Sequence, residues 1–170
     1  MSIKVFFDLD NTIFDLYNRP NWLSMLENEQ EEVFAEYGDN NGWLSYINRI
    51  SFNEAVTALM MEFGVEFEVI TWLPMQASPE YEERCRQKKT EWVKKNLPFV
   101  SAINCVSYGL PKQNFIKKRA QRMILFDDNK EVCEMWETNK QRIAIQVSEN
   151  NPVDKMLNEL LCELEAEYIE

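Results

Sequence analysis

The fold is indicated by one segment near the start of the chain, Lys4-Val5-Phe6-Phe7-Asp8-Leu9-Asp10-Asn11-Thr12. The apolar run from Ile3 to Phe7 predicts a short buried strand. Two carboxylates, Asp8 and Asp10, follow at once, and ligands of open α/β sheets bind just beyond such strand ends. Two close acids repel each other unless a cation or a shared proton lies between them. Because a lone Asp-x-Asp can also simply cap a turn, the interpretation depends on the rest of the chain.

The composition is that of an ordinary globular domain. The chain has 170 residues, of which 45% are hydrophobic and 28% charged, which fits one domain with a good core. Its 29 acids and 18 bases give a formal net charge of −11, which argues against binding a nucleic-acid polymer. The sequence contains no histidine, so His-dependent nucleophilic dyads and most zinc or non-haem iron sites are excluded.

The cysteines and the hydropathy pattern favour a cytoplasmic protein that does not bind membranes. Cys85, Cys105, Cys133 and Cys162 are scattered without a Cys-x-x-Cys spacing, which predicts buried free thiols in a reducing compartment. No basic segment followed by a signal-like apolar run opens the chain, so we expect no secretory signal. No apolar stretch approaches the roughly 18 residues that a membrane span needs.

Strands and helices are expected to alternate along most of the chain. Strands are predicted over 3–7, 66–71, 102–108, 123–129 and 142–147, and helices over 51–63, 79–96, 113–120, 131–139 and from 152 onward. The helix over 51–63 is expected to start at a Ser51 cap with Glu54 as capping-box partner, and to stop at Gly64. The basic residues of the 79–96 helix, Lys89 among them, are expected to form a solvated face. This order predicts an α/β fold with a doubly wound, parallel, five-stranded Rossmann-like sheet.

Residues 15–49 are predicted to form a small helical cap inserted between the first strand and the first crossover helix. Apolar residues recur at helical spacing from Trp22 to Tyr37, and again from Trp43 to Ile50. Residues 38–42 separate the two stripes. A helical layer packed on the sheet is the alternative. The expected division is therefore a core of residues 1–14 and 50–170 and a cap of residues 15–49.

Polar residues that could take part in catalysis or bind a metal stand at three further strand ends. Thr71 ends the second strand, where a turn hydroxyl is the plain explanation. Lys112 follows the third strand, with Lys117 and Lys118 as alternatives on the next helix. Asp127 and Asp128 end the apolar run 123–126, and two adjacent carboxylates in that position are unfavourable without a cation. This acidic pair is the strongest support from the residues themselves for a metal site.

These four segments together resemble the signatures of the haloacid dehalogenase-like (HAD) phosphatase superfamily. Asp8, Asp10 and Thr12 match the Asp-x-Asp-x-Thr signature, and Thr71, Lys112 and the Asp127-Asp128 pair follow in the order of the other three. The segments 69–73, 91–93, 108–112 and 125–128 are similar to a branch found in phages and bacteria, which resembles the 5'(3')-deoxyribonucleotidases. The chain departs from the nucleotidases at two places. It has Asn11-Thr12 where they usually have Gly-Val or a similar pair, and Trp72 where they often have Ser.

The resemblance implies a role for each matched residue. Asp8 would be the nucleophile, and Asp10 would protonate the leaving oxygen and later activate water. Mg²⁺ would bind Asp8, the backbone carbonyl of Asp10 and Asp128, with Asp127 supporting them. Thr71 and Lys112 would neutralise phosphoryl oxygens. Further substrate contacts are expected from Asn11, Thr12 and Trp72.

The expected activity is magnesium-dependent hydrolysis of a small phosphomonoester through an aspartyl phosphate, with a 5'-nucleotide among the candidate substrates. Asp10 favours a phosphatase over a dehalogenase, which lacks the second acid. A phosphomutase and a non-catalytic phosphate-binding protein are the alternatives. The expected partner is a small phosphorylated metabolite or nucleotide, and a homodimer is left open.

Overall fold

The protein is built on a five-stranded parallel sheet with the strand order β3-β2-β1-β4-β5. The computed structural model describes residues 2–16, 19–36, 42–117 and 119–169. The strands are β1 (Ile3–Phe7), β2 (Glu66–Trp72), β3 (Ala102–Val106), β4 (Arg122–Asp127) and β5 (Arg142–Gln146). All four neighbouring pairs are parallel, so the predicted doubly wound Rossmann-like sheet is confirmed.

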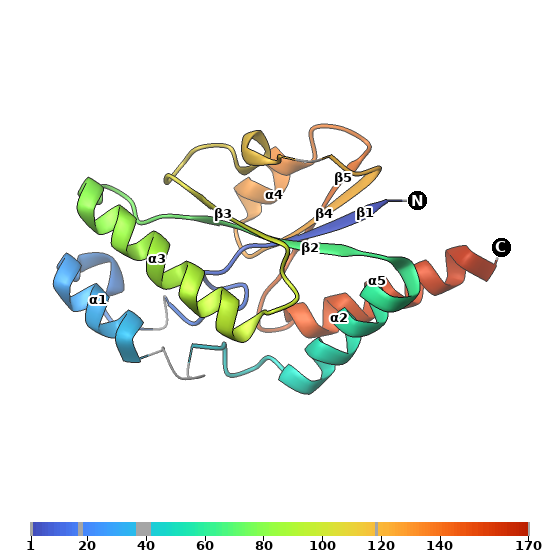
Figure 1. The fold of residues 1–170 in the computed structure, drawn as a ribbon, viewed down its shortest axis with the longest axis horizontal. Helices are drawn as coiled ribbons and strands as arrows, with labels where there is room; N and C mark the ends of the chain where they lie inside the picture. Colours follow the sequence, from blue (N-terminus) through green and yellow to red (C-terminus); the bar gives the residue numbers. More distant parts are fainter. Residues whose placement is uncertain (1, 17–18, 37–41, 118, 170) are drawn as a thin grey trace.

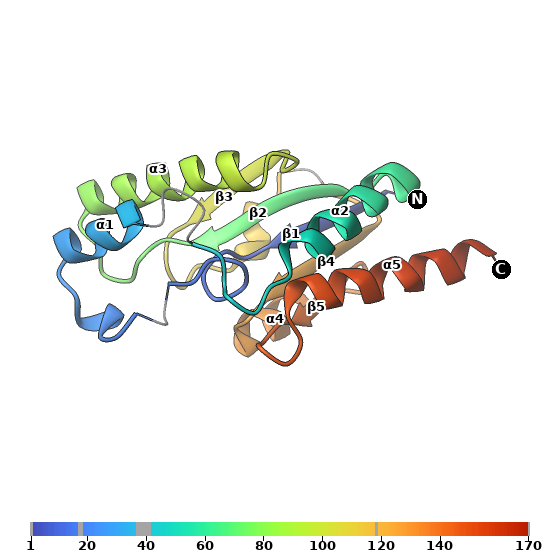
Figure 2. The same ribbon diagram turned by 90° about the horizontal axis from the view of Figure 1, so that it is seen from below.

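Helices cover both faces of this sheet. One face is covered by α2 (Arg49–Phe63), α3 (Pro79–Asn96) and α5 (Val153–Ile169), and the other by α4 (Lys130–Trp136) (Figures 1 and 2). Alternate residues of β1 serve the two layers. Val5 and Phe7 belong to the larger apolar cluster, whereas Phe6 packs with Trp136 of α4 in the smaller one. The central strand is therefore buried on both sides, as its continuous apolar run predicts.

The chain reverses its direction of travel across the sheet at β1. It runs outward through β2 and β3, then returns past β1 to β4 and β5. The carboxyl ends of β1 and β4 lie side by side, with Phe7 paired with Phe126 and Asp8 N–H donating to Phe126 O at 2.9 Å. Such a switch point is where open α/β sheets bind their ligands. It holds Asp8 and Asp127.

Several predicted helices are shorter or start elsewhere. Residues 43–47, expected to be helical, form turns in which Leu44 N–H donates to Ile13 O at 2.9 Å, because this segment packs on the loop after β1. The first crossover helix begins at Arg49 and is capped by Asn48, which accepts from the Ile50 and Ser51 amides. The Ser51 cap was therefore wrong. Gly64 ends the helix in a left-handed conformation, as expected.

Two other predicted helices also differ. The stretch from Trp22 contains a 3₁₀ turn, η1 (Trp22–Ser24), and then α1 (Glu27–Glu36), because Met25 is extended; Tyr37 lies outside the described residues. In place of a helix over 113–120 there is a short 3₁₀ helix, η3 (Lys112–Phe115). Lys112 therefore begins a tight turn against the sheet, where its side chain is buried.

The helix α1 lies against the N-terminal half of α3 (Figures 1 and 2). Polar contacts join the two helices: Glu27 accepts from the Ser78 amide and hydroxyl, both at 2.9 Å, while Gln30 pairs with Tyr81 and Glu31 with Arg84. Glu27 thereby binds at the N-terminus of α3, a favourable place for a carboxylate. Whether residues 15–49 form a separate cap stays a prediction.

The four cysteines are free thiols, but only two of them are buried as predicted. Cys85 and Cys133 are buried free thiols, but Cys105 is half-buried and Cys162 is exposed. Among the described residues, no helix combines the length and apolar character needed to cross a membrane.

Candidate active site

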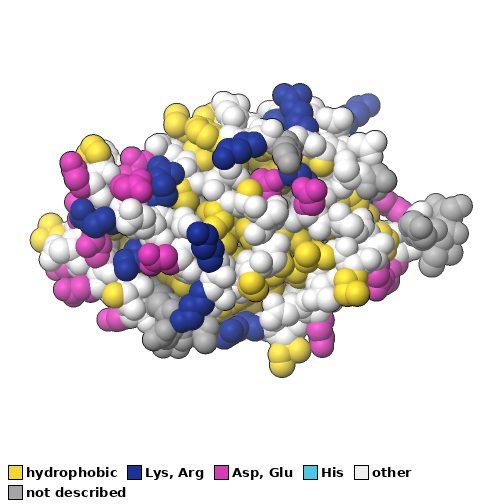
Figure 3. All heavy atoms as spheres, viewed as in Figure 1, with side chains coloured by type: hydrophobic (Ala, Val, Ile, Leu, Met, Phe, Trp, Pro, Cys, Tyr) yellow, Lys and Arg dark blue, Asp and Glu magenta, His cyan; other side chains and the backbone are white. Residues whose placement is uncertain are grey.

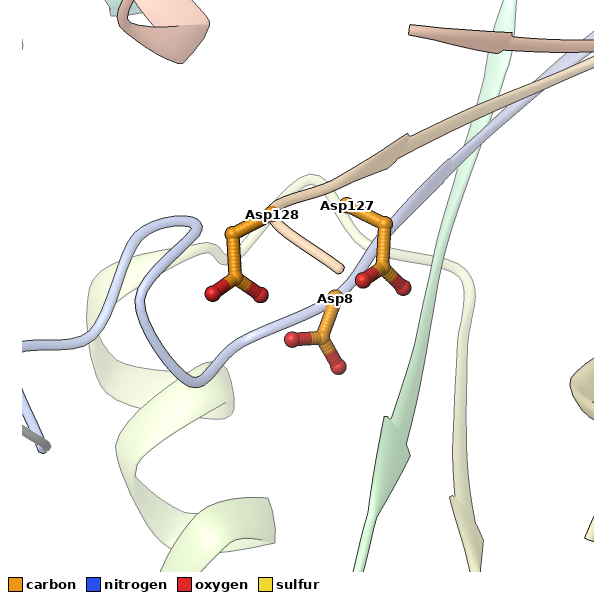
Figure 4. Close-up of side chains that lie close together, drawn as sticks. All are labelled: Asp8, Asp127 and Asp128. Atoms are coloured by element: carbon orange, nitrogen blue, oxygen red, sulfur yellow. The ribbon is translucent and has the colours of Figure 1, made fainter. Parts of the chain in front are cut away.

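Three carboxylates meet at the switch point of the sheet. Asp8 follows β1, Asp127 ends β4 and Asp128 comes directly after it; one oxygen from each lies within 4.8 Å of the others (Figure 4). Asp8 and Asp127 are buried. Because β1 and β4 are neighbours in register, the predicted strand-end acids are brought together by the sheet itself.

Lys112 lies between two of these carboxylates. Its ammonium donates to Asp8 Oδ1 at 2.7 Å and to Asp127 Oδ2 at 2.6 Å, and only 2% of the residue is exposed. Burial by itself would lower the pKa of Lys112, but Asp8 and Asp127 raise it above its usual value. The lysine is therefore held as a cation. Of the alternatives, Lys117 is exposed and does not line the cleft around these carboxylates, and Lys118 lies outside the described residues.

One ammonium does not neutralise three carboxylates. Burial, followed by repulsion from Asp8, raises the pKa of Asp127 to about 6. Burial, then Asp8 and Asp127, raise the pKa of Asp128 to about 7. Three ionised carboxylates and one ammonium would carry a formal charge of −2. A bound divalent cation would restore neutrality, and carboxylate oxygens are the ligands that Mg²⁺ prefers. The donor set therefore fits the ion that the sequence predicts.

A second lysine, Lys89 of α3, pairs with Asp10. Its ammonium donates to Asp10 Oδ2 at 2.6 Å, to Trp72 O at 2.7 Å and to Thr71 Oγ1 at 3.2 Å. Burial, and secondarily repulsion from Asp8, raise the pKa of Asp10, while Lys89 opposes that rise. Asp10 Oδ1 is buried and has no hydrogen-bond partner among the described residues. Asp10 thus has one oxygen bound to a cation and one available for a proton.

The sequence interpretation missed Lys89, which was assigned to a solvated face. The residue is 3% exposed. Other basic side chains do lie along the outer surface of α3 (Figure 3), so the assignment fails at this one position. The signal was its spacing, since Lys89 stands four residues after Cys85 and three before Trp92, both buried. A lysine within an apolar stripe needs a buried acceptor.

Of the other residues predicted for the site, some line the cleft that contains the carboxylates and some are buried outside it. Asn11, in a left-handed conformation with φ 57°, and Trp72 line the same cleft as the carboxylates. Thr71 and Thr12 are buried and do not line it; Thr71 contacts Lys89, and Thr12 Oγ1 has no partner among the described residues. The Asp10 carboxylate is not part of the three-acid group, so its predicted metal contact rests on its backbone carbonyl.

A cleft of about 460 Å³ opens over these side chains. Its lining includes the acids and the two lysines, and also Trp22, Met25, Gln30, Trp72 and Tyr108. Trp22 thus lines the cleft, whereas Trp43 packs against Phe52 and Trp92 in the core. The volume suits a small molecule.

We expect Mg²⁺ to stabilise the fold more at about pH 8 than at about pH 5.5, because protons compete for the same carboxylates. Without metal, the raised pKa values of Asp127 and Asp128 mean that the folded state binds more protons than the unfolded state between about pH 4 and 7, so their contribution to stability falls as pH rises through that window. Thermal unfolding with and without millimolar Mg²⁺ at both pH values measures the effect.

The matched variants for this experiment are Asp128→Asn and Glu131→Gln. Asp128→Asn should lose most of the Mg²⁺ shift, while the exposed Glu131, in the first turn of α4, should not matter. Equal Mg²⁺ shifts at both pH values, or a wild-type shift in Asp128→Asn, would contradict the assignment of the ligands.

Comparison of the chain with protein-family models and with curated proteins gave no match in either case.

Proposed function

We propose that the protein is a magnesium-dependent phosphatase that hydrolyses a small phosphomonoester through an aspartyl-phosphate intermediate. One observation carries the proposal: two acids two residues apart in the sequence, Asp8 and Asp10, are each bound by a different buried lysine at the same strand end. Asp8 shares Lys112 with Asp127, whereas Asp10 keeps one oxygen without a hydrogen-bond partner among the described residues. This separation supports one acid as nucleophile and the other as proton carrier.

In the first step, an oxygen of Asp8 attacks phosphorus and the bond from phosphorus to the leaving oxygen breaks. Lys112 holds Asp8 Oδ1 at 2.7 Å, so Oδ2 is the attacking atom. Asp10 gives its proton to the leaving oxygen, and its raised pKa favours the protonated state that this needs. The alcohol leaves, and Asp8 carries the phosphoryl group as an acyl phosphate.

In the second step, the Asp10 carboxylate takes a proton from water, and the resulting oxygen attacks the phosphorus of the acyl phosphate. The bond between Asp8 and phosphorus breaks, which releases inorganic phosphate and restores both acids. The pairing with Lys89 stabilises the ionised form that Asp10 must adopt here.

Asp8, Asp127 and Asp128, with the Asp10 carbonyl, would hold Mg²⁺, whose charge would offset that of the phosphoryl oxygens. The ammonium of Lys112 adds a second positive charge at the same place. Lys89, held by Thr71 Oγ1 and Trp72 O, keeps the Asp10 carboxylate oriented.

The direct test is release of phosphate from a panel of phosphomonoesters, including deoxynucleoside monophosphates, with Mg²⁺ and with chelator. We expect turnover with Mg²⁺, loss of turnover with chelator and no activity in Asp8→Asn. Binding of phosphate esters without turnover would instead favour a phosphate-binding protein. Transfer of the phosphoryl group within a sugar phosphate would favour a mutase.

Replacing Lys89 with methionine should shift the pH dependence of the reaction. Without this ammonium the pKa of Asp10 rises further, so the second step requires a higher pH, and kcat at neutral pH should fall about tenfold. The pH profile of kcat measures the shift. Lys88→Met is the matched control, because Lys88 is the exposed neighbour on the same helix. An unchanged pH profile in Lys89→Met would exclude Lys89 as the residue that sets the ionisation of Asp10.

A further inference from the structure

The cleft has an aromatic wall next to the catalytic lysine. Trp72 ends β2, and its ring centroid lies 5.0 Å from that of Tyr108, with the planes at 50°. The Lys112 ammonium lies 5.2 Å from the centroid of the Trp72 ring. Both aromatic residues line the same cleft as Asp8 and Asp10. A group bonded to a phosphoryl group at Asp8 would therefore have an aromatic surface beside it.

The Trp72 ring is fixed in position before any ligand arrives. Its Nε1–H donates to Leu110 O at 2.9 Å, and Tyr108 and Lys112 contact the ring. Tyr108 is 48% exposed, and the apolar Met75 and Leu23 are exposed around the same cleft. A preformed aromatic surface with an apolar border costs little ordering when a ring binds on it.

The charges of the cleft oppose a second anionic group. Of the described lining residues, five are carboxylates and two are lysines, a formal charge of −3; the acids are Asp8, Asp10, Glu27, Asp127 and Asp128. Both lysines already bind carboxylates. A divalent cation and the protonated Asp10 of the proposed first step would together bring this charge to zero, which leaves no positive charge to attract a second anion. No further cation among these residues is available for a carboxylate or a second phosphate.

We propose that Trp72 and Tyr108 form the leaving-group subsite, which selects phosphomonoesters with an uncharged planar ring close to the phosphate over aliphatic esters and over esters with a second anion. This inference rests on the proposed function for its orientation, because Asp8 defines where the phosphoryl group sits. It also gives Trp72 a function other than phosphate binding, because the only N–H of its side chain donates to Leu110 O.

Binding of non-hydrolysable phosphonates tests the subsite without turnover. Calorimetry with Mg²⁺ should show that benzylphosphonate binds about three- to tenfold more tightly than cyclohexylmethylphosphonate, the range expected from one aromatic contact. 4-Carboxybenzylphosphonate should bind more weakly than benzylphosphonate, because its second anion finds no free positive charge in the cleft. Trp72→Leu and Tyr108→Leu should each reduce the preference for the planar ring toward unity. Phe115→Leu is the control, since Phe115 is a partly exposed aromatic residue that does not line the cleft.

Hydrolysis of benzyl phosphate, cyclohexylmethyl phosphate and 4-carboxybenzyl phosphate separates this inference from the proposed function. The three leaving alcohols are similar in acidity, so differences in kcat/KM report the subsite rather than the reactivity of the ester bond. Preferential binding of benzylphosphonate with no hydrolysis of any ester would overturn the phosphatase and leave the subsite standing. Hydrolysis of all esters with equal binding of the two ring types, or a preference that survives both leucine variants, would overturn the subsite alone. Neither binding nor hydrolysis would overturn both.

Discussion

Asp8→Asn should reduce turnover by at least about a thousandfold, the scale seen when a covalent nucleophile is removed. The amide has nearly the same shape as the carboxylate, but it cannot act as an anionic nucleophile. Because Asp8 also repels Asp127 and Asp128, its replacement should lower their pKa values toward normal. Phosphate release at saturating substrate measures the loss. Rapid-quench detection of a phosphorylated protein should show label in the wild type and none in the variant.

The fold of this variant should survive, which makes the test interpretable. Asp8 follows the last residue of β1, and the hydrogen bond from its backbone N–H to Phe126 O does not involve the side chain. The thermal unfolding temperature should therefore stay close to that of the wild type. Near-normal magnesium-dependent hydrolysis by a folded Asp8→Asn protein would eliminate the covalent mechanism.

Lys112→Ala should reduce kcat/KM by about 30- to 1000-fold, or about 2–4 kcal/mol of transition-state stabilisation. The variant removes a buried ammonium that binds Asp8 at 2.7 Å and Asp127 at 2.6 Å. It also leaves those carboxylates without their cation, so the fold should lose stability as well. Steady-state kinetics and thermal unfolding, both at high Mg²⁺, separate the two effects.

Lys112→Met keeps most of the side-chain volume and is the second variant for this test. Lys117→Ala is the control and should be close to neutral, as for most surface substitutions. We expect the same of Lys118→Ala, whose side chain lies outside the described residues. An active Lys112→Met together with an inactive Lys117→Ala would place the catalytic lysine five residues later in the chain than the structure indicates.

The sheet and the acidic group were predictable because each depends on local patterns. Apolar runs bounded by turn formers mark the strands, and parallel strands bring their carboxyl ends to one edge. Asp8, Asp127 and Asp128 therefore meet as predicted. Lys112 was predictable for the same reason, since it follows a strand that ends at that edge.

Features that depend on packing between distant segments were not predictable. Residues 43–47 have a helical spacing of apolar side chains, yet they bury Trp43 by pairing with Phe14 in the loop after β1. The partner of Lys89 is likewise 79 residues away in the sequence. A helical pattern shows that this lysine faces inward, but not which carboxylate lies opposite.

The central position of β1 has a consequence for how the protein is made. This strand is synthesised first, yet its neighbours are β2 and β4, and the lysine that pairs with Asp8 comes 104 residues later. During translation β1 can pair with β2 early, but Asp8 stays without Lys112 and the acids of β4 until residues 112–128 have emerged. We expect the segments that carry Asp8, Lys112 and Asp127 to be among the last to acquire protection from hydrogen exchange during refolding. A ribosome-bound chain that stops before β4 should not bind Mg²⁺.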